Sequence, residues 1–66
     1  MAVAKVIEIT AESSESFEDA IKQGIAKAAE TVRNIKAAWV NGQQVTVADG
    51  QVAAYRVDLK VTFLVD

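Results

Sequence analysis

A single tryptophan and one arginine are the side chains best suited to bind a small molecule in this chain. Trp39 is the only tryptophan among the 66 residues, and its ring can pack at the core edge, contact another subunit or stack on a flat ligand. Arg56 carries a fixed positive charge and five N–H donors, which suit an anionic ligand. We expect the Arg56 guanidinium either to lie over the Trp39 ring or to form a surface ion pair with a carboxylate.

The chain lacks the side chains on which most catalytic and soft-metal sites depend. It contains no histidine and no cysteine, so zinc sites and disulfide bonds are not expected. The three glycines are scattered and form no phosphate-binding loop. Ser13, Ser14 and Ser16 precede a predicted helix, where helix capping accounts for them, and no base is present to activate a serine nucleophile. We therefore expect no enzymatic activity.

The carboxylates offer oxygen ligands for a hard cation such as calcium. None of them follows the spacing of an EF-hand loop, so we interpret them as solvated charges and predict no metal site. The acidic residues considered are Glu8, Glu12, Glu15, Glu18, Asp19, Asp49, Asp58 and Asp66.

The net charge and the hydropathy pattern limit the classes of partner. A formal charge of −2 argues against nucleic-acid binding, which requires a basic surface. No stretch approaches the roughly 20 apolar residues that span a membrane, and the first residues do not resemble a signal peptide. We expect a cytoplasmic protein without a membrane partner.

Hydrophobic spacing predicts one α+β domain, residues 1–66, with the order β-α-β-β. Alternating or β-branched residues predict strands over 3–10, 35–47 and 55–65, and 3.6-residue spacing predicts a helix over 16–34. The most regular alternation is that of residues 55–65, which we place at the centre of a three-stranded, antiparallel-dominated sheet. The helix packs on one face of this sheet.

The helix has predicted signals at both ends. Ser16 and Asp19 fit a capping box, in which the serine oxygen accepts a backbone N–H and the carboxylate accepts another in return. Asn34 is the predicted stop. The apolar face of the helix consists of Phe17, Ala20, Ile21, Ile25, Ala28 and Val32.

The direction of Trp39 follows from the alternation of side chains along a strand. Ala38 and Val40 form an apolar set that fits the helix side, which places Trp39 on the opposite face, with Ala37, Asn41 and Gln43. Asn41-Gly42 is either a hairpin turn or a β-bulge. We favour the bulge, because residues 48–51, Ala-Asp-Gly-Gln, form a better turn.

One helix leaves half of the sheet uncovered, and that half holds Trp39 and Leu64. A domain of this size buries only about 60% of its surface on folding, yet 52% of the residues are hydrophobic. We therefore predict that identical subunits cover the second face.

Across its whole length the chain resembles the dodecin family. The stretches that carry the resemblance are KVIEIT (5–10), SSESFEDAI (13–21), ETVRNI (30–35), DGQVAAYRV (49–57) and LKVTF (59–63), in this order. The resemblance implies βαββ subunits assembled into a hollow homododecamer. It also implies a storage protein that binds flavins, such as FMN or riboflavin, stacked between tryptophans.

Several positions that match the family's flavin site carry other residues. Ala37 stands where the stacking tryptophan is expected, and Trp39 occupies the position of a glutamate two residues later. Arg56 replaces a glutamine that binds the flavin ring, and Gln44 replaces an arginine. Similarly, Leu64 replaces a basic residue and Ala11 a glycine. Two hypotheses remain: a flavin-binding storage protein, and a structural or ion-binding shell without flavin affinity.

Overall fold

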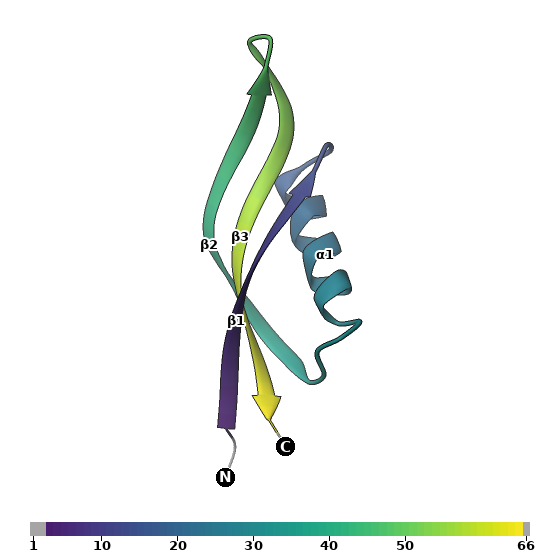
Figure 1. Ribbon diagram of the computed structural model, residues 1–66, viewed down its shortest axis with the longest axis vertical. Coiled ribbons are helices and arrows are strands. Elements are labelled where there is room, and N and C mark those ends of the chain that lie inside the picture. The colour runs from purple at the N-terminus through teal and green to yellow at the C-terminus, as the bar shows by residue number, and fades with distance from the viewer. Residues whose placement is uncertain (1–2, 66) are drawn as a thin grey trace.

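The computed structural model describes residues 3–65 as one three-stranded sheet with one helix. The elements are β1 (Val3–Ser13), α1 (Phe17–Ala28), β2 (Ile35–Ala48) and β3 (Gln51–Val65). The strand order is β1-β3-β2, and both pairs are antiparallel. The predicted β-α-β-β order and the central position of the last strand are confirmed (Figure 1).

The strands extend beyond their predicted ends, and a tight turn joins β2 to β3. β1 reaches Ser13 instead of Thr10, and β3 begins at Gln51 instead of Tyr55. Asp49 and Gly50 both have positive φ, 53° and 75°. Positive φ at both central residues is the requirement of a type I′ hairpin turn, for which Asp-Gly is a preferred pair. The predicted turn is therefore confirmed, and the alternative hairpin at Asn41-Gly42 is wrong.

The predicted capping box at the beginning of α1 contains two hydrogen bonds, and the structure shows one of them. The backbone N–H of Asp19 donates to Ser16 Oγ at 2.9 Å. The Asp19 carboxylate does not return a bond to Ser16, because it accepts from the hydroxyl of Ser13 and the amide of Gln23, both at 2.6 Å. Ser13, which is buried, also accepts the N–H of Glu15 at 2.9 Å. This network fixes the β1–α1 connection.

The end of α1 was predicted too late in the chain. The helix ends at Ala28, and residues 29–31 form a turn closed by the N–H of Val32 donating to the Ala28 carbonyl at 2.9 Å. Thr31 and Val32 are β-branched and favour leaving the helix. Asn34, with φ of 62°, redirects the chain into β2 instead of ending the helix.

The core lies between α1 and one face of the sheet. Ala20, Val57, Leu59 and Val61 are at most 1% exposed. Alternate residues of β3 thus point at the helix, as the period of two predicts. Partly buried neighbours complete this layer: Ile7, Ile9, Ala11, Phe17, Ile21, Ile25 and Ile35.

A bulge in β2 changes which residues share a face. Val40 pairs with Leu59 and Gly42 with Asp58, so Asn41 is an extra residue in β2. This confirms the predicted bulge, but its effect was missed, because an extra residue reverses the alternation beyond it. Gln43 consequently pairs with buried Val57 and lies on the helix side, so its predicted place beside Trp39 is wrong.

α1 approaches β1 closely at a glycine. A Cβ atom added to Gly24 would lie 2.8 Å from the Cβ of Ala11, a distance that requires the helix or the strand to move. The methyl group of Ala11 thus occupies the space that a side chain at position 24 would need.

We expect Gly24→Ala to destabilise the protein, and Ala11→Gly to relieve that effect. Overpacking costs about 1–3 kcal/mol, partly offset by the roughly 1 kcal/mol gain in helix propensity of alanine over glycine. Denaturant unfolding at one protein concentration should show the double variant to be more stable than Gly24→Ala alone. Additive effects of the two changes would contradict this contact.

The subunit is elongated. Its radius of gyration is 13.5 Å, against about 11 Å for a compact chain of this length. The β2–β3 hairpin extends well past the N-terminal end of α1 (Figure 1). Within residues 3–65, no helix has both the length and the apolar character needed to cross a membrane.

Candidate functional site

All four predicted binding residues lie on the sheet face opposite α1, which we call the open face. Residues paired across antiparallel strands point to the same side of a sheet. Trp39 pairs with Lys60 and Ala37 with Thr62, and these partners alternate with the buried residues of β3. Beyond the bulge, Gln44 pairs with Arg56 on the same face. The bulge therefore places Gln44 with Trp39.

Trp39 is the most exposed large hydrophobic side chain of residues 3–65. It is 74% exposed, as the predicted direction away from the helix requires. Val6 lies on the same face, since it pairs with Thr62, and is 56% exposed. Exposed apolar area of this kind marks an interaction surface.

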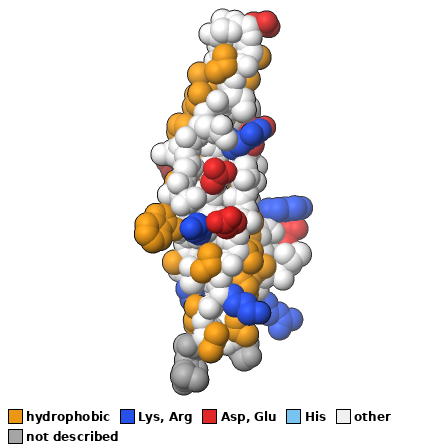
Figure 2. All heavy atoms as spheres, turned by 60° about the vertical axis from the view of Figure 1, so that its left-hand side comes forward, with side chains coloured by type: hydrophobic (Ala, Val, Ile, Leu, Met, Phe, Trp, Pro, Cys, Tyr) orange, Lys and Arg blue, Asp and Glu red, His pale blue; other side chains and the backbone are white. Residues whose placement is uncertain are grey.

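A band of paired charges crosses the open face at mid-length. Lys60 Nζ lies 3.9 Å from Glu8 Oε1, and the Thr10 hydroxyl donates to Asp58 Oδ1 at 3.0 Å. Figure 2 shows acidic and basic side chains together in the middle of the subunit, with hydrophobic ones above and below. Ligands that cover this band must satisfy both signs of charge.

Arg56 uses its charge within its own subunit. Its Nη2 and Nε atoms donate to Glu12 Oε1 at 2.8 and 3.1 Å. In β3, Arg56 is four residues from Lys60, the partner of Trp39, a separation of about 13 Å. Of the two expectations for Arg56, the ion pair with Glu12 is confirmed. Among residues 3–65 the structure shows one aromatic contact, between Phe17 and Tyr55, and none between the Arg56 guanidinium and the Trp39 ring.

Sequence reasoning missed the contribution of Lys60 and Asp58. Together with the bulged Asn41, these residues line a small cavity of about 180 Å³. The β2–β3 register places them beside Trp39. Predicting this register from the sequence requires the position of the Asp49-Gly50 turn and of each β-bulge between the turn and Trp39.

The carboxylates of the described residues are spread over the subunit. Among residues 3–65, no three carboxylates gather closely enough to hold an ion. Asp66, one of the acidic residues considered as a ligand, lies outside the described residues.

Comparison with known proteins identifies relatives of the whole chain. The family model Dodecin matches residues 3–66. Dodecin from Streptomyces davaonensis is 32% identical, with a TM-score of 0.94 over 98% of this chain and 96% of that one. An arginine-to-alanine mutant of the T. thermophilus dodecin is 30% identical, with a TM-score of 0.94 over 100% and 98% of the two chains.

A third matching structure is that of a relative that binds calcium. The calcium-chelating immunodominant antigen calcium dodecin from Mycobacterium tuberculosis, with a novel calcium-binding site, is 35% identical to this chain. It has a TM-score of 0.83 and covers 92% of this chain and 87% of its own. No curated protein sequence gives a significant match.

Proposed function

The chain belongs to the dodecin family, and we propose that it is a small-molecule-binding and storage protein that holds a flat aromatic ligand at its open face. Flavin, as riboflavin or FMN, is the ligand class we propose first. We further propose that the chain is a single domain, acts as a cytoplasmic homododecamer and catalyses no reaction. The observation that carries the proposal is the 74% exposed Trp39 on a face that its own chain leaves uncovered.

The side chains of the open face can stack on a flavin ring and form hydrogen bonds with one edge of it. The Trp39 indole offers a stacking surface, and stacking of an aromatic base on such a ring contributes about 1–3 kcal/mol. The Gln44 amide offers a donor and an acceptor for a ring edge. Ala37 offers no ring, so any stacking would occur about 6.6 Å along the strand from the usual position in the family.

The charge pairs argue for a neutral ligand. Arg56 is paired with Glu12, and Lys60 lies near Glu8. With Asp58 also on this face, the band has no spare positive charge for a phosphate. The earlier expectation that Arg56 favours an anionic ligand assumed a free guanidinium.

We therefore expect riboflavin to bind at least as tightly as FMN. Quenching of flavin fluorescence during titration with protein measures both dissociation constants under the same salt conditions. Binding of FMN that is tenfold tighter than that of riboflavin would contradict the role assigned to the charge pairs. Absence of binding to both would reject flavin as the ligand.

An ion-binding or structural shell is the second candidate. It is favoured by the 35% identity to calcium dodecin and by the carboxylates Glu8, Glu12 and Asp58 on the open face. Calorimetric titration with calcium chloride, together with unfolding in the presence and absence of a chelator, distinguishes it from flavin storage. Calcium binding without flavin binding would favour this second candidate.

A further inference from the structure

The bulge in β2 consists of an asparagine followed by a glycine. Val40 pairs with Leu59 and Gly42 with Asp58, so Asn41 between them has no pairing partner in β3. β2 is also an edge strand, which has β3 as its neighbour on one side only. A bulge interrupts the ladder of backbone hydrogen bonds at the extra residue. The Asn41-Gly42 peptide is therefore less restrained than a peptide in the centre of the sheet.

An asparagine that precedes glycine is open to attack by the next backbone nitrogen. The Gly42 nitrogen can close a five-membered ring on Asn41 Cγ, and glycine has no Cβ to hinder the approach and adopts a wide range of φ and ψ. Asn34 is the other asparagine of the chain, and it precedes Ile35, a β-branched residue with a stiff side chain. The local sequence thus favours ring closure at Asn41 and hinders it at Asn34.

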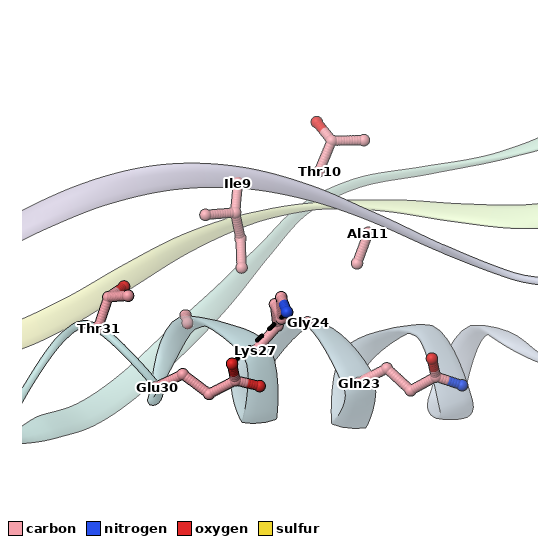
Figure 3. A pocket seen from close by; sticks show the side chains of 9 residues that line it. Ile9, Thr10, Ala11, Gln23, Gly24, Lys27, Glu30 and Thr31 are labelled. Atoms are coloured by element: carbon pink, nitrogen blue, oxygen red, sulfur yellow. Dashed lines mark hydrogen bonds and ion pairs between the residues drawn. The ribbon is translucent and has the colours of Figure 1, made fainter.

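Polar and charged side chains surround Asn41 on the open face. The small cavity of about 180 Å³ has a polar lining that consists of Glu8, Thr10, Asn41, Asp58 and Lys60. In Figure 3 the Thr10 side chain points away from α1, whereas those of Ile9 and Ala11 point toward it. The cavity therefore lies on the side of the sheet that the helix does not cover, where Asn41 is exposed.

Two charged residues of this cavity can assist the attack. A Cβ atom added to Gly42 would lie 3.5 Å from Asp58 Oδ2, so this oxygen is close to the Gly42 backbone. The other oxygen, Oδ1, accepts the Thr10 hydroxyl at 3.0 Å, which orients the carboxylate. A positioned carboxylate can accept the proton that a nucleophile loses. The positive charge of Lys60 stabilises the negative charge that develops on Asn41 Oδ1.

We propose that Asn41 is a self-modification site, at which the chain deamidates without an enzyme. The Gly42 nitrogen bonds to Asn41 Cγ as its proton passes to Asp58. The Cγ–Nδ2 bond then breaks, and the amide leaves as ammonia with that proton. One water molecule opens the succinimide, either at Cγ to give aspartate or at the backbone carbonyl to give isoaspartate.

Either product adds a carboxylate to a cavity that already contains Glu8 and Asp58. The formal charge of the chain changes from −2 to −3, since one neutral amide becomes one anion. Isoaspartate also inserts a methylene group into the main chain of β2. As the protein ages, the open face is thus expected to become less favourable for any anionic ligand. The modification itself depends neither on flavin binding nor on assembly.

Mass spectrometry of the folded protein stored in ¹⁸O-labelled water measures the reaction. We expect ¹⁸O to enter residue 41, as aspartate and isoaspartate, faster at alkaline than at neutral pH, while Asn34 stays unchanged. Gly42→Ala should slow the reaction several-fold, and its methyl group has room, because Asp58 Oδ2 would be at ordinary contact distance. Persistence of Asn41 in the folded protein, or equal modification of Asn34, would overturn the proposal.

Asp58→Asn separates the contribution of the fold from that of the local sequence. Its amide oxygen can still accept from Thr10, but it cannot take the proton from Gly42. We expect slower deamidation than in wild type when both are folded, and equal rates in concentrated urea, where the cavity is absent. Glu18→Gln, which removes an exposed carboxylate of α1, is the matched control and should react like wild type. Equal rates for folded Asp58→Asn and wild type would overturn the assignment of Asp58 as proton acceptor.

Discussion

The double substitution Ala37→Trp with Trp39→Glu is expected to raise affinity for riboflavin by about tenfold to a hundredfold. It places an indole at the family's stacking position and the family's glutamate two residues later. The variant moves the one indole about 6.6 Å along the strand, so the expected gain is the difference between stacking at the family's position and stacking at the displaced one. A full stacking contact contributes about 1–3 kcal/mol, which bounds this gain, and each 1.4 kcal/mol changes a dissociation constant tenfold. Both residues lie on the open face, paired with Thr62 and Lys60, so the exchange keeps the indole on that face.

Fluorescence titration of wild-type and variant proteins measures this gain. Ala38→Trp is the matched control, because Ala38 pairs with buried Val61 and its side chain lies on the helix side. We expect no gain from the control. If Ala37→Trp with Trp39→Glu binds riboflavin no better than wild type, the open face is not the ligand site of this chain.

The single substitution Trp39→Ala is expected to weaken assembly by about two orders of magnitude in concentration. A tryptophan side chain buries about 150–250 Å², and Trp39 is 74% exposed in one subunit. If a neighbour covers most of that area, its removal costs about 3–4 kcal/mol at roughly 25 cal/mol per Å². Such an effect is typical of an interface hot spot.

Size-exclusion chromatography with light scattering over a dilution series measures the change. Lys22→Ala is a suitable control, because Lys22 is exposed on α1 and forms only a surface pair with Glu18 at 3.1 Å. An unchanged assembly midpoint for Trp39→Ala would remove its role as a subunit contact. The indole would then be available to a ligand alone.

Local signals in the sequence predicted the local features of the fold. The Asp49-Gly50 turn and the Ser16 cap each depend on residues within a few positions of one another, and both are confirmed. The alternation of β3 was also visible, because its central residues are paired on both sides and one set faces the helix.

The errors arose where distant parts of the chain decide the structure. Helical spacing continues through Val32, but α1 ends at Ala28 and the chain turns toward β2, which pairs with β3 on the side away from β1. The bulge at Asn41 was predicted, yet its reversal of the alternation was overlooked, which misplaced Gln43. Likewise, Arg56 was matched with Trp39 by face alone, whereas the register pairs it with Gln44 and brings Glu12 within reach.

Sedimentation equilibrium at micromolar concentration tests most directly whether identical neighbours cover the open face. The account predicts association, because the open face is exposed in an isolated subunit. The homododecamer proposed from membership in the dodecin family predicts one closed species of about twelve chains, each of 7.1 kDa. A folded monomer that persists at these concentrations, with native helix and sheet content, would contradict it.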